Sequence, residues 1–182
     1  MEVGRQAIVL HGWDDDPNSG WLGWLQSQLR DRGYDVLAPH FPAIRKREDI
    51  VVWQQQMDEL GGQIRHHALI IGHSLGCWQA LRAVEHLPGS VVADQVVLVA
   101  GFYDAPDKRA REFFSPEPKW SVLQAKASKW VCLYSDDDEI VTPNRTIMLA
   151  EKLDAKLVAL HGFGHFLGSR GMHTFPELLE YL

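Results

Sequence analysis

Short apolar blocks recur along the chain, and each is a nearly unbroken apolar run without regular alternation of polar residues. Six such blocks start at residues 7, 34, 68, 95, 130 and 156, and they read AIVLHG, YDVLAP, ALIIGHS, QVVLVAG, WVCLYS and KLVALHG. Because a strand in a parallel sheet is covered on both faces, its residues are apolar in succession. The blocks therefore predict six parallel strands.

Helical patterns separate these blocks. Apolar residues that share a helical face are Trp21, Leu22, Leu25 and Leu29 in one pattern, and Ile50, Trp53, Met57 and Leu60 in another. Thr174, with Glu177 three residues later, matches a capping box and predicts a last helix. Strands and helices in alternation predict a doubly wound α/β fold of three layers, with helices on both faces of the sheet.

Length and charge limit the classes of protein that this chain can represent. With 182 residues, 46% of them hydrophobic, it can bury one sizeable core, so residues 1–182 are expected to form a single domain. A formal net charge of -6 without a basic run argues against nucleic acid or an anionic membrane as a partner. The N-terminal residues resemble neither a signal peptide nor a membrane span, so a cytoplasmic location is expected.

The third apolar block joins a helical pattern through the residues GHSLG, 72 to 76. A strand that turns at once into a helix brings the residues two before and two after the apex almost into contact, which favours glycine at both places. The apex residue, Ser74, would then have a strained backbone and a hydroxyl that stands clear of the sheet. The sequence thus predicts a nucleophile elbow, with a glycine-rich turn and a surface serine as the alternative.

A serine nucleophile needs a histidine base and a carboxylate that orients the histidine. The fold predicts the order Ser, acid, His, with the partners in the loops that follow the fifth and sixth strands. The last loop, HGFGHF, offers His165 in a turn between glycines, and His161 at the strand end is the alternative, with His173 less favoured. His73, inside the elbow, is expected to line the pocket or to form a local hydrogen bond.

The candidate acids are Asp136, Asp137 and Asp138, in the sequence SDDDEIV. They lack the alternation and the glycine of a calcium loop, so the alternative to a catalytic role is a solvated loop. α/β hydrolases typically carry G-x-x-D-x-x-V here, and the stretch resembles that motif with Ser135 in place of the glycine. The resemblance implies Asp138 as the acid, and Asp137 remains open.

Two backbone amides are candidates for stabilising the oxyanion of an acyl-transfer reaction. Leu75 follows the nucleophile at the start of a helix. The loop after the first strand, HGWDDDP, begins like the oxyanion loop common to α/β hydrolases, and this resemblance implies the amide of Trp13. His11 is expected to shape that loop.

Over essentially its full length the chain resembles the α/β-hydrolase superfamily, and its small size with GHSLG, SDDDEIV and GHF is similar to the compact serine-hydrolase family of retinoblastoma-binding protein 9. The resemblance implies a triad of Ser74, Asp138 and His165, six parallel strands, and esterase or aminopeptidase activity on small substrates. The L-x-C-x-E motif behind that family's protein-binding name has Gln79 here in place of Glu. That binding property is therefore not implied, and any protein partner is unknown.

The expected reaction is hydrolysis of a small carboxylic ester or amide through an acyl-enzyme, with no metal or organic cofactor. The chain has no long insertion that could form a large lid, which favours small substrates. Aromatic residues expected near the active-site edge, as candidates for an acyl pocket, are Phe41, Phe102 and Phe166, with Trp13, Trp21 and Tyr103. Ordinary core packing is the alternative for these aromatic residues. The alternatives are a non-catalytic binding protein with the same fold, and an acyltransferase with an acceptor other than water.

Overall fold

The computed structural model describes residues 4–13, 15–45, 47–105 and 111–182. Its centre is a sheet whose strands are β1 (Gln6–Leu10), β2 (Asp35–Leu37), β3 (Leu69–His73), β4 (Gln95–Val99), β5 (Trp130–Ser135) and β6 (Lys156–Leu160). The order across the sheet is β2-β1-β3-β4-β5-β6, and every neighbouring pair is parallel. The prediction of six parallel strands is confirmed.

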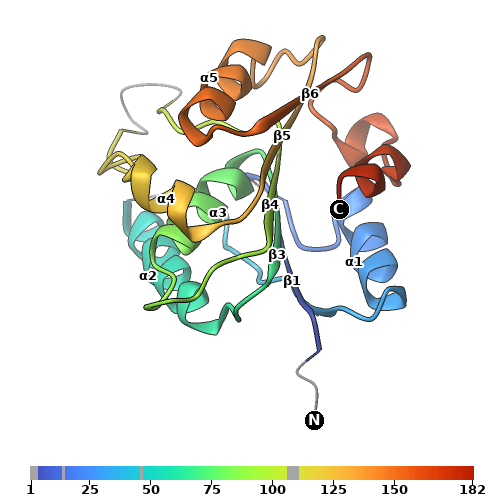
Figure 1. Ribbon diagram of the computed structural model, residues 1–182. Coiled ribbons are helices and arrows are strands. Elements are labelled where there is room, and N and C mark those ends of the chain that lie inside the picture. The colour runs from blue at the N-terminus through green and yellow to red at the C-terminus, as the bar shows by residue number, and fades with distance from the viewer. Residues whose placement is uncertain (1–3, 14, 46, 106–110) are drawn as a thin grey trace.

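Helices cover both faces of the sheet (Figure 1). The helices are α1 (Trp21–Asp31), α2 (Arg47–Gln63), α3 (Leu75–Glu85), α4 (Trp120–Lys126) and α5 (Pro143–Leu153), followed by two 3₁₀ helices, η1 (Gly168–Arg170) and η2 (Pro176–Tyr181). Figure 1 shows α2, α3, α4 and α5 on one face, and α1 with the C-terminal 3₁₀ helices on the other. The three-layer α/β arrangement is therefore as predicted.

The strands supply side chains to two separate cores, one on each face of the sheet. In β1, Ile8 and Leu10 pack with α2 and α3, whereas Ala7 and Val9 pack with α1. All four side chains are fully buried. This two-sided burial is the reason that the central strands β1, β3, β4 and β5 are apolar in succession rather than alternately.

The C-terminal segment differs from the prediction of a capped helix. Residues Pro176–Tyr181 form a 3₁₀ helix, and no side chain caps it. Phe175 precedes the helix and is fully buried against Trp21 and Phe166. The capping-box prediction is wrong because burial of Phe175 fixes where the chain enters this turn, so that Thr174 does not cap it.

The segment 103–120 returns to the core where the structure describes it. Phe113 and Phe114 are buried and pack on Trp78 of α3, while residues 106–110 lie outside the described part. In the described ranges, no inserted domain covers the carboxyl edge of the sheet. None of the described helices combines the length and the apolar character that a membrane span requires.

Candidate active site

Ser74 lies in the tight turn between β3 and α3. Its backbone has φ 55° and ψ -120°, a conformation that side-chain-bearing residues rarely adopt. A Cβ atom on Gly72 would lie 2.6 Å from the Gly76 carbonyl oxygen, and one on Gly76 would overlap the Leu10 carbonyl oxygen in β1. Both glycines are required because backbone atoms occupy the space that a side chain would need.

Replacing Gly76 with alanine is expected to lower the free energy of unfolding by about 3 kcal/mol, because a fixed backbone carbonyl must move to accept the new methyl group. The matched control is Gly62→Ala in α2, where a Cβ atom would have nothing within 4 Å. That variant should be unchanged or slightly stabilised. Urea denaturation measures both, and equal midpoints for the two variants would contradict the packing argument.

Ser74, His165 and Asp138 form one chain of hydrogen bonds. The Nε2 atom of His165 lies 2.9 Å from the Oγ atom of Ser74, and its Nδ1 atom lies 2.8 Å from Oδ2 of Asp138. Oδ1 of Asp138 accepts the amides of Ile140 and Val141, at 2.9 Å each. Because a carboxylate only accepts, Nδ1 carries the ring proton and Nε2 can accept the hydroxyl proton.

The neighbouring candidates contact other groups. His161 is exposed, and its Nδ1 atom lies 2.7 Å from Oδ2 of Asp136, which lowers the pKa of that carboxyl. Asp137 accepts the hydroxyl of Ser135 at 2.5 Å and the amide of Gly164 at 2.8 Å, and the Ser135 bond is the main cause of its lowered pKa. Neither His161 nor Asp137 contacts Ser74 in the structure.

Ser135 joins the loop after β5, which contains Asp138, to the loop after β6, which contains His165. Its hydroxyl donates to Asp137 and accepts the amide of Phe163 at 2.9 Å. The sequence reveals only that a serine stands where the related motif has glycine. Its role depends on a contact across 28 positions of the chain, which no local pattern could have revealed.

Two buried side chains hold the backbone at His165 and Phe166. The Nε2 atom of His73 lies 3.0 Å from the carbonyl oxygen of His165, and the indole Nε1 of Trp21 donates to the carbonyl of Phe166 at 3.0 Å. Phe166 itself has a positive φ of 56°. The two hydrogen bonds, one from the end of β3 and one from the start of α1, therefore fix this strained loop.

Burial is the main cause that lowers the pKa of His73 to about 3, and the nearby charge of His165 adds to it. His73 is therefore neutral at physiological pH. Since the His165 carbonyl can only accept, Nε2 of His73 carries the proton.

The pKa of His73 predicts how stability depends on pH. In the unfolded chain this side chain binds a proton below its ordinary pKa of 6.5, whereas the folded protein excludes that proton down to about pH 3. Unfolding then takes up a proton, so lowering the pH from 7 to 5 should reduce the free energy of unfolding by about 2 kcal/mol through His73 alone. Urea denaturation at both pH values should show that His73→Gln loses this part of the difference and that His161→Gln keeps it. An unchanged pH dependence in His73→Gln would contradict the assignment.

The loop after β1 passes beside Ser74. A Cβ atom on Gly12 would lie 3.2 Å from Cβ of Ser74, which brings the following residue, Trp13, to the same edge. The Nδ1 atom of His11 lies 2.9 Å from the Gly12 carbonyl oxygen, and its Nε2 accepts the Phe41 amide at 2.9 Å. Burial lowers the pKa of His11, so a neutral ring joins this loop to the segment after β2.

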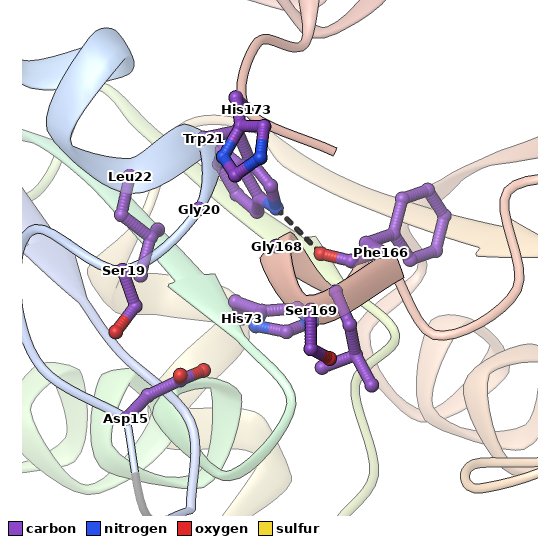
Figure 2. Close-up of a pocket in the computed structure, with 11 residues that line it drawn as sticks. Asp15, Ser19, Gly20, Trp21, Leu22, His73, Phe166, Gly168, Ser169 and His173 are labelled. Atoms are coloured by element: carbon purple, nitrogen blue, oxygen red, sulfur yellow. Dashed lines mark hydrogen bonds between the residues drawn. The ribbon is translucent and has the colours of Figure 1, made fainter. Parts of the chain in front are cut away.

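The predicted pocket residues separate into two groups. His73 and Phe166, the chain neighbours of Ser74 and His165, line a cavity of about 180 Å³, shown in Figure 2. Phe41 and Phe102 instead lie in the core on the other face of the sheet. The cavity also includes Asp15, from the acidic residues of the HGWDDDP stretch. Within the described ranges, no group of three or more His, Cys, Asp or Glu side chains is placed to hold a metal ion.

Known proteins resemble this chain over nearly its full length. Residues 7–182 match the serine hydrolase family. Serine hydrolase RBBP9 of Rattus norvegicus is 32% identical over 99% of this chain and 95% of that protein, and YdeN of Bacillus subtilis (strain 168) is 26% identical over 98% and 94%.

Solved structures show the same fold. The crystal structure of the ydeN gene product has a TM-score of 0.86 at 24% identity, covering 97% of this chain and 96% of that one. Alpha/beta hydrolase domain-containing protein 10 from mouse has a TM-score of 0.63 at 14% identity, covering 87% and 81%. The chain belongs to the serine hydrolase family, and its fold is that of the α/β hydrolases.

Proposed function

We propose that this protein hydrolyses small carboxylic esters or small amides, with Ser74 as nucleophile, His165 as general base and Asp138 as the acid that orients the histidine. The observation that carries the proposal is the continuous chain of hydrogen bonds from Ser74 to Asp138, at 2.9 and 2.8 Å. Membership of the serine hydrolase family supports it independently.

In the proposed mechanism, the Ser74 oxygen attacks the acyl carbon while Nε2 of His165 takes its proton. The amides of Leu75 and Trp13 donate to the oxyanion. Leu75 also lies at the N-terminus of α3, where the helix dipole favours negative charge. His165 then protonates the leaving group as the bond to the acyl carbon breaks. Water, deprotonated by the same histidine, releases the acid and restores Ser74.

Small substrates fit the surroundings of Ser74 best. The cavity lined by its chain neighbour His73 has a volume of about 180 Å³, below the roughly 300 Å³ at which pockets for drug-sized ligands begin. Trp13, the candidate oxyanion residue, has a side chain that is 46% exposed, so it does not close the site. A cavity of this size favours short acyl chains over long ones.

The experiment is a series of 4-nitrophenyl esters from acetate to dodecanoate, assayed with the wild type and with His165→Gln. We expect kcat/KM to be highest for the short esters and to fall by at least about 10³-fold in the variant, because the general base is lost. A folded wild type that hydrolyses no ester faster than His165→Gln would contradict the proposal.

A further inference from the structure

His11, the first residue after β1, contacts two backbone segments through the two nitrogens of its ring. Its Nδ1 atom lies 2.9 Å from the carbonyl oxygen of Gly12, and its Nε2 atom lies 2.9 Å from the amide nitrogen of Phe41, in the segment after β2. The side chain is only 1% exposed. Both ring nitrogens thus bind backbone groups inside the protein.

The two contacts determine which ring nitrogen carries the proton. The Phe41 amide can only donate, so Nε2 of His11 accepts and carries no proton. In a neutral ring the proton is then on Nδ1, which donates it to the Gly12 carbonyl. Burial is the main cause that lowers the pKa of His11, and this keeps the ring neutral at physiological pH. One tautomer therefore forms both hydrogen bonds.

The Gly12 carbonyl belongs to the same peptide unit as the amide of Trp13. A peptide unit is planar, and in the trans form its C=O and N–H bonds point in opposite directions. A hydrogen bond that fixes the Gly12 carbonyl therefore also fixes the direction of the Trp13 N–H. Because a hydrogen bond to the carbonyl polarises the whole peptide unit, the same bond makes this N–H a stronger donor.

This peptide unit lies beside Ser74, and its amide takes no part in the hydrogen bonds of the fold. A Cβ atom on Gly12 would lie 3.2 Å from Cβ of Ser74 and 3.5 Å from the carbonyl oxygen of His73. In the ranges that the structure describes, the Trp13 amide donates to no backbone or side-chain acceptor. An N–H group in this place is free to bind a group on a substrate.

Aromatic neighbours hold the ring of His11 in place. Phe41 and Trp53 meet it edge to face, with centroid distances of 5.9 and 6.5 Å, and His40 stacks on it at 5.6 Å. Phe41 and Trp53 are buried, so the ring cannot turn without moving the core. This packing makes the bond to Gly12 a fixed feature of the loop rather than one of several side-chain positions.

We propose that His11 is a positioning residue for the oxyanion site, and that it holds the Gly12–Trp13 peptide so that the Trp13 amide donates to the oxyanion formed at Ser74. His11 acts through this peptide and touches no reacting atom. The proposal rests on the proposed hydrolase function, because an oxyanion forms only if Ser74 attacks an acyl group.

The test uses two amide side chains, each of which imitates one ring nitrogen of His11. In His11→Asn the side-chain nitrogen takes the place of Nδ1 and can donate to Gly12, whereas the longer side chain of His11→Gln reaches the place of Nε2 and can accept from Phe41. With 4-nitrophenyl acetate, kcat should fall about 30-fold in His11→Gln, less than the roughly 10²- to 10³-fold for complete removal of an oxyanion donor. The loss in His11→Asn should be below about fivefold, because the bond to Gly12 is kept.

Inhibition by trifluoroacetone measures the oxyanion site without turnover. Ser74 adds to the ketone carbon, His165 takes the serine proton, and the ketone oxygen becomes an oxyanion. The inhibition constant should rise in His11→Gln by about the factor by which kcat falls, while KM stays within about twofold. A loss of packing alone would instead reduce the amount of active enzyme, which the stoichiometry of a fluorophosphonate adduct counts. His40→Gln is the matched control, because it changes an exposed histidine that stacks on His11, and both constants should stay within about twofold of the wild type.

A measurement on the wild type needs no variant: ¹⁵N NMR should find the proton of the His11 ring on Nδ1, and a proton on Nε2 would overturn the proposal. In an active enzyme, equal kcat values for His11→Gln and His40→Gln would also overturn it. Equal losses in His11→Gln and His11→Asn would do the same, because they would trace the effect to packing of the ring. If the folded wild type hydrolyses no ester and takes no fluorophosphonate, the proposed function fails, and the role of His11 fails with it.

Discussion

Replacing Ser74 with alanine should lower kcat/KM for a short ester by about 10⁴- to 10⁶-fold and leave the fold intact. In the proposed mechanism the hydroxyl is the attacking group, which no other residue can replace. It makes no capping bond to α3, and the hydrogen bond that it loses is the one with His165. The free energy of unfolding should therefore change by less than about 1 kcal/mol.

The control for this variant is Ser121→Ala, which removes an exposed hydroxyl from α4. Its kcat/KM should equal that of the wild type. Steady-state kinetics with 4-nitrophenyl acetate, together with urea denaturation, separates lost chemistry from lost folding. Retention of more than about 1% of wild-type activity in Ser74→Ala would show that another group is the nucleophile.

Asp138→Asn is expected to reduce kcat by about 10⁴-fold, since an amide facing Nδ1 of His165 favours the wrong tautomer of the ring. The retained amide oxygen can still accept the bonds from Ile140 and Val141, so the loop should keep its shape. Asp137→Asn changes the adjacent residue, which is exposed and bonds to Ser135 and Gly164 instead. That variant should lose less than about tenfold, because its charge is screened by solvent.

The two aspartate variants are best compared by single-turnover kinetics as a function of pH. Loss of activity in Asp137→Asn with an active Asp138→Asn would reassign the acid to Asp137, the alternative that the sequence leaves open. Similar moderate losses of activity in both variants would mean that neither carboxylate alone orients His165 and that both side chains contribute to its position.

The fold could be predicted because its main signals are local. Each apolar block contains its own strand signal, and the GHSLG turn contains both glycines that the close approach of β3, α3 and β1 requires. Burial on both faces of the sheet then accounts for the missing alternation of polar residues.

The wrong and missing predictions concern contacts between distant segments. Thr174 and Glu177 fit the capping-box pattern, but that pattern contains no information on the burial of Phe175 beside Trp21. Likewise, no local pattern indicates that His73 and Trp21 hold the carbonyls of His165 and Phe166, which lie 92 and 145 positions away in the chain.

The roles of the three adjacent aspartates, Asp136 to Asp138, also depend on contacts that the sequence does not reveal. Three adjacent carboxylates are alike in sequence, yet Asp136 contacts His161, Asp137 contacts Ser135, and Asp138 contacts His165. The direction in which each side chain leaves the turn decides its partner. The three aspartates are distinguished only by the position of the loop after β6, which contains His161 and His165, beside the end of β5.

The central claim, that Ser74 is an activated nucleophile, is tested most directly by labelling the folded protein with a fluorophosphonate and measuring intact mass and the modified peptide. The account predicts one adduct, on Ser74, that is absent from Ser74→Ala and forms at least about 10²-fold more slowly in His165→Ala, because the base is lost. A folded wild type that takes no adduct, or takes it on another residue, would contradict the account.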